Sequence, residues 1–294
     1  MLSDMPPYET PDVRPTDLPR RAAAGGLLAL ALAAGHARAG EAGGSTEGLA
    51  KQAQNPIADL ISVPFQDNVN FGVGERGRTQ NVLDFQPVVP FKIGGGWNLI
   101  TRTITPVIYQ PSLYKGVPGV RTSDDPDFGL GDINPTGFLA TSLRRDLMVG
   151  FGPTVTLPTA TAKDLGTGKW SAGPAAVAVW MPGRWVVGAL VNNQWSFAGD
   201  DDRRQVDQML VQPFVNYNLG KGWYLASSPI ITADWEAKQG KNVWTVPVGG
   251  GFGRLFRVGK LPVNTSVQAF DNVESPEFGT DWTLRLQVQF LFPK

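Results

Sequence analysis

The chain has 294 residues, and its 26 basic and 26 acidic side chains balance, so it lacks the basic excess expected of a nucleic-acid-binding protein. It contains no cysteine, which excludes disulfides, thiolate metal sites and a thiol nucleophile. After the N-terminal region, no apolar run approaches the roughly 20 residues that a membrane-spanning helix requires.

The N-terminal region has the features of an export signal. Two arginines precede an apolar run over residues 22–34, and the small residues Ala37 and Ala39 follow where a signal peptidase reads them. We therefore predict a cleaved signal peptide over residues 1–39 and a protein of the Gram-negative cell envelope.

Residues 40–57 differ in composition from the rest of the chain. A flexible Gly/Ser stretch leads into residues 46–53, which predict one or two helical turns capped by Ser45 or Thr46. This segment is either a periplasmic leader or a small plug in the mouth of the domain that follows, residues 58–294.

The remainder of the chain predicts about twelve strands of about ten to thirteen residues, near the length that a tilted strand needs to cross a bilayer. We expect them near residues 61–71, 80–91, 97–109, 128–140, 147–158, 170–181, 185–197, 208–219, 223–236, 243–256, 262–272 and 282–292. In the last strand every second residue from Trp282 is apolar and the others are polar, except Leu291. A period of two puts one set toward lipid and the other toward the lumen.

Short and long connections alternate between these strands. Turns such as residues 182–184 and 220–222 alternate with long or polar loops such as residues 110–127 and 159–169. Tight periplasmic turns and longer outer loops are typical of up-and-down barrels, whereas a sandwich with Greek-key connections does not sort its loops in this way. The predicted fold is an all-β, transmembrane, up-and-down antiparallel β-barrel.

Aromatic residues recur at both ends of the predicted strands. Amphipathic rings favour the headgroup level, and a spacing of ten to twelve residues along a tilted strand covers about 25–30 Å. Two belts at that separation indicate a membrane barrel. The interface aromatics are Trp97, Tyr109, Trp170, Trp180, Trp185, Trp195, Trp223 and Trp235.

Charged and amide side chains alternate with apolar neighbours inside several strands. An arginine that faces lipid at mid-membrane costs about 2–4 kcal/mol, so these side chains are expected to point inward. They either line a water-filled path or pair into a salt-bridged plug. The lumen-lining candidates are Asp84, Arg102, Asp234, Arg285, Gln287 and Gln289, with Gln86, Gln212, Asn216 and Gln268 in the same polar interior.

The chain offers little for catalysis. Its one histidine, His36, lies inside the predicted signal, so the mature protein lacks the residue needed for Ser–His hydrolysis and for a His-ligated metal site. The glycine clusters at residues 166–170 and 249–254 do not match the phosphate or dinucleotide loops. We expect no catalytic residues, no cofactor and no metal.

Four segments carry a resemblance to a known family. Residues 55–66 (NPIADLISVPFQ), 128–135 (FGLGDINP), 166–174 (GTGKWSAGP) and 287–294 (QVQFLFPK) resemble a Gram-negative outer-membrane family whose members often carry the misleading title "neuromedin U". That family is similar to the porin-like group named after the MetA pathway of phenol degradation. The resemblance implies an outer-membrane barrel and passage of small organic compounds, and it supplies no catalytic residues.

The expected function is passive or facilitated passage of small solutes, aromatic or hydrophobic ones included, across the outer membrane. The alternative is a closed barrel with a structural, adhesive or partner-binding role. The expected partners are outer-membrane lipid and lipopolysaccharide, the barrel-assembly machinery and a small-molecule solute, with no nucleic acid.

Overall fold

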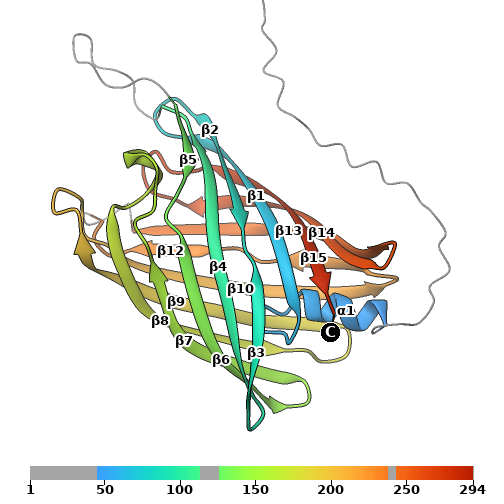
Figure 1. Ribbon diagram of the computed structural model, residues 1–294. Coiled ribbons are helices and arrows are strands. Elements are labelled where there is room, and N and C mark those ends of the chain that lie inside the picture. The colour runs from blue at the N-terminus through green and yellow to red at the C-terminus, as the bar shows by residue number, and fades with distance from the viewer. Residues whose placement is uncertain (1–44, 113–125, 238–242, 294) are drawn as a thin grey trace, which may run out of the picture. The chain divides into compact units, whose positions relative to one another are not determined.

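The computed structural model describes residues 45–112, 126–237 and 243–293. Residues 1–44, which include the predicted signal peptide, lie outside the described residues. The described part from Ser45 onward contains one short helix and a closed antiparallel barrel of twelve strands (Figure 1), as the sequence predicted. Within the described residues, no helix is long and apolar enough to span a membrane.

The twelve crossings are formed by fifteen strand segments because three crossings are interrupted. The elements are α1 (Thr46–Ala53), β1 (Ile61–Val73), β2 (Arg78–Phe85), β3 (Val88–Gly94), β4 (Trp97–Gln110), β5 (Asp127–Leu130), β6 (Asn134–Arg144), β7 (Leu147–Thr156), η1 (Lys163–Leu165), β8 (Lys169–Trp180), β9 (Trp185–Gly199), β10 (Asp207–Gly220), β11 (Trp223–Ser227), β12 (Ile231–Asp234), β13 (Trp244–Val258), β14 (Leu261–Glu274) and β15 (Trp282–Phe292).

The barrel closes between its first and last strands. β1 pairs with β15 from Ile61 opposite Phe292 to Phe71 opposite Trp282, without a register shift. Backbone N–H and C=O groups have no water to bond in the hydrocarbon of a bilayer, so a membrane sheet requires such closure. The long final strand predicted from alternation is therefore the closing strand of the fold.

The prediction of twelve continuous strands was wrong at three places. The chain leaves the sheet pattern at residues 86–87, 131–133 and 228–230, which separate β2 from β3, β5 from β6 and β11 from β12. Pro87 and Pro229 lack the N–H that a strand interior needs to donate. Strand pairing resumes after each interruption, at Val88, Asn134 and Ile231. Strand-like sequence therefore lies on both sides of each break, and the sequence pattern did not reveal it.

Side chains of β15 alternate as predicted, and the single irregularity has a structural cause. Leu286 is 42% exposed on the outer face, and Arg285 is buried on the inner face. Leu291, the apolar residue at an inward position, is fully buried in a cluster with Leu49 of α1 and Leu255 of β13. The departure from alternation therefore marks the contact between the barrel wall and α1.

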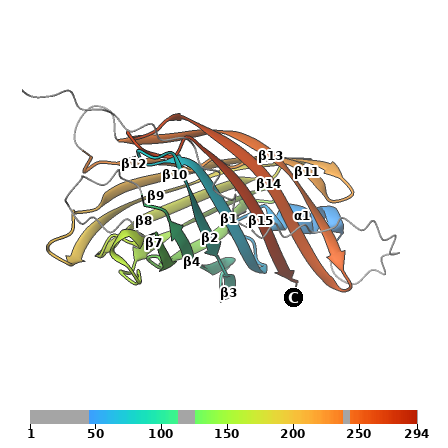
Figure 2. The ribbon, with the colours of Figure 1, turned by 90° about the horizontal axis from the view of Figure 1, so that it is seen from above.

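The helix lies at the end of the barrel that carries the short turns. Figures 1 and 2 both show α1 beside the C-terminal residues at this end, where it packs against β10 and β13. Its predicted cap is confirmed: the backbone N–H of Gly48 donates to Oγ of Ser45 at 3.1 Å.

Apolar side chains fill part of the interior next to α1. Ile57, Ile100, Phe138, Val179 and Val186 are buried together in a cluster from the helix linker and from β4, β6, β8 and β9. This side of the interior is therefore apolar, whereas the sequence analysis named only polar side chains as lumen candidates.

The eight predicted interface aromatics divide between the two ends of the strands. Trp97, Trp180, Trp185 and Trp223 stand next to the short turns, and Tyr109, Trp170, Trp195 and Trp235 stand next to the long loops. All except Trp223 are more than one-third exposed. Large exposed aromatic rings at two levels fit the interface belts of a bilayer.

The alternation in β15 makes a direct test of the membrane-facing surface. Leu286→Arg is expected to impair assembly because it places a charge toward lipid, at about 2–4 kcal/mol near mid-membrane. Gln287→Arg, one residue along the strand, faces the interior and is expected to fold nearly normally. The measurement is the heat-modifiable shift of the folded barrel on gels, and equal yields of the two variants would contradict this assignment of faces.

Candidate channel interior

A band of polar side chains crosses the interior between the long-loop end and α1. It forms because alternate positions of β1, β2, β4, β14 and β15 carry amide or charged groups, while the positions between them carry apolar ones. Three cavities open into the interior: a large one at the long-loop end, lined by β9, β10 and β12, a second beside β1 and β14, and a chamber next to α1.

Arg285 ties the last strand to a distant part of the wall. Its Nε donates to Oδ1 of Asn68 on β1 at 2.9 Å, and its Nη1 donates to the backbone carbonyl of Ser228 at 2.7 Å. The guanidinium also lies 4.8 Å from the ring centroid of Phe270 on β14. Ser228 is in the β11–β12 interruption. In the sheet order, β13 and β14 lie between this interruption and β15. The Arg285 side chain therefore spans part of the lumen.

The β11–β12 interruption has a second interior partner. Both the backbone N–H and the hydroxyl of Ser228 donate to Oε1 of Gln268 at 3.1 Å. Arg285 lines the cavity beside β1 and β14, whereas Ser228 and Gln268 line the chamber next to α1. The Arg285–Ser228 hydrogen bond therefore separates these two spaces.

The Asp84 carboxylate acts electrostatically on both Arg102 and Arg285, but at a longer distance than a salt bridge. Among the described residues, neither Arg102 nor Arg285 forms an ion pair with Asp84 or Asp234. Asp84 accepts a hydrogen bond from Nδ2 of Asn68 at 3.3 Å. Asp234 pairs instead with Arg204.

The chamber next to α1 has a volume of about 150 Å³ and brings together the predicted interior amides. Nη2 of Arg102 donates to Oε1 of Gln86 at 2.7 Å at its edge. The chamber is lined by six amide side chains from four parts of the wall, the β2–β3 interruption, β10, β14 and β15: Gln86, Gln212, Asn216, Gln268, Gln287 and Gln289. Phe214 and Leu190 add an apolar side to the same wall.

The segment that carries α1 forms the floor of this chamber. Gln54 exchanges two side-chain hydrogen bonds with Asn218 of β10, at 3.0 and 3.2 Å, and Nδ2 of Asn55 donates to the sulfur of Met148 at 3.2 Å. Lys51 donates through Nζ to the carbonyl of Gly183 in the β8–β9 turn. These bonds fix the segment to one stretch of the wall, from β7 through the β8–β9 turn to β10.

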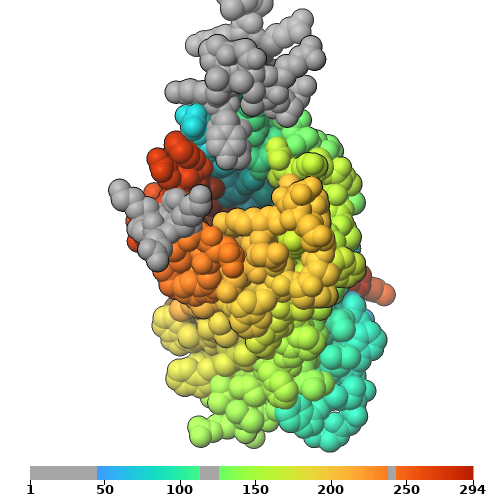
Figure 3. All heavy atoms as spheres, turned by 90° about the vertical axis from the view of Figure 1, so that its left-hand side faces the viewer, coloured from blue at the N-terminus to red at the C-terminus, as the bar shows by residue number. Residues whose placement is uncertain are grey.

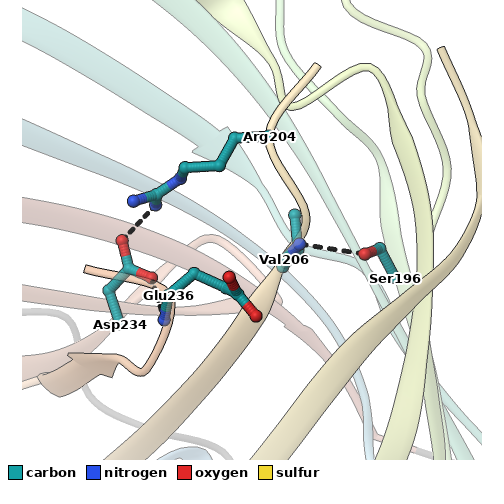
Figure 4. A network of polar contacts seen from close by, with 5 residues as sticks. All are labelled: Ser196, Arg204, Val206, Asp234 and Glu236. Atoms are coloured by element: carbon teal, nitrogen blue, oxygen red, sulfur yellow. Dashed lines mark hydrogen bonds and ion pairs between the residues drawn. The ribbon is translucent and has the colours of Figure 1, made fainter. Parts of the chain in front are cut away.

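The cavity at the long-loop end is the largest of these three, at about 710 Å³. Arg204 reaches across to Asp234, and the backbone N–H of Glu236 donates to Oδ1 of Asp234 at 3.2 Å (Figure 4). Val206 is held to Oγ of Ser196 at 2.9 Å. Asp234 thus lies at the mouth, away from Arg102 and Arg285.

The long-loop end is hollowed on its surface. Figure 3, which faces this end, shows a depression between the orange-to-red segments and the green ones, with blue-green strands in its depth. Asn192, Gln194, Gln208 and Thr232 line the cavity below it with polar groups.

One outer loop, residues 157–168, folds against the inner face of the wall. Phe128 and Leu130 of β5 are exposed outward, so Gly129 and the following Gly131 face inward. A Cβ at Gly129 would lie 2.0 Å from Oγ1 of Thr161, which shows how closely the loop approaches.

Asp132 and Arg203 hold this loop in place. The Asp132 carboxylate accepts hydrogen bonds from the backbone N–H and the hydroxyl of Thr167, at 2.7 and 2.9 Å, and from the N–H of Ala160 at 3.2 Å. Arg203 donates to the carbonyls of Thr167 and Lys163, at 3.1 and 2.7 Å. Sequence reasoning noted the segments 128–135 and 166–174 but missed that Asp132 joins them.

Other interior contacts also lay beyond sequence reasoning. The partner of Arg285 is a backbone carbonyl, which has no sequence signature. Leu291 was the one available signal for the α1 contact. In the described part of the chain, no group of three or more His, Cys, Asp or Glu side chains could hold a metal ion.

The loop contacts predict a protease-sensitive variant. Asp132→Asn weakens three hydrogen bonds to a charged acceptor, each worth about 1.5–3 kcal/mol, and is expected to free the loop. Trypsin cleavage at the exposed Lys163 should then accelerate about tenfold or more, measured on the folded protein in liposomes. Asp201→Asn removes a charge from an exposed nearby loop and serves as the control; equal cleavage of both variants would contradict the role of Asp132.

Known structures share this architecture. An outer membrane channel from Pseudomonas putida F1 has 16% sequence identity, covers 79% of this chain and 93% of its own, and superimposes with a TM-score of 0.55, which shows a common fold. Two others give TM-scores below 0.5: the CymD monoaromatic hydrocarbon channel (11% identity, 87% and 95% covered, 0.47) and outer membrane phospholipase A from Escherichia coli (13%, 86% and 99%, 0.43).

No curated protein sequence matches the chain. The profile of the family described as "Putative MetA-pathway of phenol degradation" matches residues 65–259, which is more than half of the 294 residues. The chain therefore belongs to this family of outer-membrane-type β-barrels, in agreement with the resemblance found in its sequence.

Proposed function

We propose that the protein is an outer-membrane channel for small organic solutes, closed in this structure by its own N-terminal segment. The observation that carries the proposal is the series of polar cavities between the long-loop mouth and α1. Twelve strands enclose more width than side chains alone readily fill, and the space left over is lined by amides and charges together with apolar groups.

Family membership and the shared fold support this proposal. The family description refers to phenol degradation, which suggests a small aromatic compound as the solute. The Pseudomonas putida barrel of the same fold is described as a channel. The solute would enter at the long-loop mouth, which we place outside the cell, and leave at the short-turn end in the periplasm.

The proposed domain organisation follows from this orientation. Residues 1–39 form a cleaved signal peptide, residues 40–57 form a plug of which the structure describes Ser45 onward, and residues 58–294 form the barrel. We assign Asp84, Arg102, Arg285, Gln287 and Gln289 to the lumen wall. The protein would then meet lipid, lipopolysaccharide and the assembly machinery in the outer membrane, without a cofactor or catalysis.

A closed structural barrel is the second candidate. It is favoured by the apolar cluster around Ile57 and Phe138, which fills the interior on one side. Under this alternative, the polar cavities hold only water, and removal of α1 does not produce a conducting path.

Release of α1 separates the two candidates. Leu49→Asp puts a carboxylate among Leu255 and Leu291, so the closed arrangement should lose stability and the open probability in planar bilayers should rise about tenfold or more. Deletion of residues 45–57 should produce steady conductance. Glu47→Gln, at an exposed position of the same helix, is the control. If Leu49→Asp and the deletion variant both fold but do not conduct, the closed barrel is favoured.

The Arg285–Ser228 hydrogen bond makes a second prediction for the same path. Arg285→Gln removes the donor to the Ser228 carbonyl, and it should lower barrel stability by about 1–3 kcal/mol because that buried acceptor loses its partner. In the background without residues 45–57, conductance should increase as the two cavities merge. Arg145→Gln, in the exposed β6–β7 turn, should change neither quantity. Unchanged conductance would show that Arg285 does not limit the path.

A further inference from the structure

The chamber next to α1 has the size of a single aromatic ring with a polar group. A cavity of about 150 Å³ has been shown to take up benzene in another protein when all its lining is apolar. The chamber here has the same volume of about 150 Å³, and Phe214, Leu190 and Val88 provide one apolar side. A ring therefore fits its dimensions, but most of its lining is polar.

Several polar side chains of the chamber have hydrogen-bonding capacity left over. Arg102 carries five N–H donors, and within the described residues its guanidinium makes one hydrogen bond, to Gln86. Asn216 is 7% exposed, and no described residue accepts from or donates to its side chain. Gln212 and Gln287 are half-buried, line the same chamber, and likewise form no side-chain hydrogen bond with a described residue. Polar groups that face a chamber without a protein partner are satisfied by water or by a ligand.

The charge of the chamber favours an anion. Arg102 is the only charged residue among the described residues that line it, and it comes from the middle of β4. Asp84 of β2 lies outside this lining and accepts from Asn68, and its carboxylate attracts the Arg102 guanidinium without forming an ion pair with it. Guanidinium groups bind carboxylates through two parallel hydrogen bonds, and the free donors of Arg102 allow this geometry.

We infer that the chamber is a binding site for a single-ring organic carboxylate, whose charged group is held by Arg102 and whose ring lies against Phe214 and Leu190. The inference rests on the proposed function, since it makes this site a step on the solute path. A neutral ring of the same size would leave the remaining N–H donors of Arg102 without an acceptor, and a small anion without a ring would leave the apolar side in contact with water.

The test is benzoate binding to the purified, detergent-solubilised full chain by titration calorimetry. Benzoate should bind more tightly than benzyl alcohol, its neutral analogue, and than acetate, which lacks the ring. Arg102→Gln should weaken benzoate about tenfold or more, the loss of one charge-assisted interaction, and should leave benzyl alcohol nearly unchanged. Arg145→Gln, which removes a positive charge from an exposed turn, should leave both affinities unchanged.

A second variant keeps the test decisive if Arg102→Gln fails to fold. Asn216→Asp adds a carboxylate to the chamber and leaves Arg102 in place, so it should weaken benzoate about tenfold or more by competition for the guanidinium. Equal affinity for benzoate and benzyl alcohol, or unaltered benzoate affinity in a folded Arg102→Gln or Asn216→Asp variant, would overturn the site.

Conductance distinguishes failure of this site from failure of the channel. If the variant without residues 45–57 conducts but the full chain does not bind benzoate, the binding site is overturned and the channel proposal stands. Benzoate binding with the expected Arg102 dependence, in a barrel that never conducts, would support the site and contradict its place on a solute path.

Discussion

Every backbone N–H and C=O group inside a bilayer must find a partner within the protein, and the rest of this structure depends on that constraint. It requires the unbroken pairing of β1 with β15. It also limits how the wall can be interrupted. At residues 131–133, the hydroxyl of Thr159 accepts from the N–H of Ile133 and donates to the carbonyl of Gly131. At residues 228–230, Arg285 and Gln268 take up the free groups of Ser228.

The same constraint gives the two interior arginines different roles. Arg285 donates hydrogen bonds to the Ser228 carbonyl and to Asn68. It therefore cross-links β15 to β1 and to the β11–β12 interruption. Arg102 makes a single hydrogen bond to Gln86 at the edge of the chamber. Both were assigned to the lumen by one rule, that a charged side chain should turn away from lipid, and this rule cannot distinguish a cross-link from a ligand-binding group.

Sequence alone predicted the parts of the fold that repeat along a strand: twelve crossings, the outward face of β15 and the cap of α1. The interior was harder to predict because β8 and β9 carry small or apolar residues on both faces. In β8, for example, the buried Ala175, Val177 and Val179 alternate with exposed alanines. Alternation of apolar and polar residues therefore could not show which face of these strands points to the lumen. The partners of Arg285 and Asp132 join positions far apart in the chain, and one-dimensional patterns do not report such pairs.

The position of α1 connects the closure of the barrel with the proposed control of the path. Leu291 is in β15, where its backbone is opposite Ser62 of β1 at the closure of the barrel. Its side chain is buried in a cluster with Leu49 of α1. Burying such a side chain contributes about 1.5–3 kcal/mol, so the contacts of Leu49, Leu60 and Leu291 together make release of the segment cost several kcal/mol. An equilibrium with that bias leaves the open form a minor state. Under the proposed function, the rate of passage therefore depends on the hold of this short segment rather than on the width that twelve strands allow.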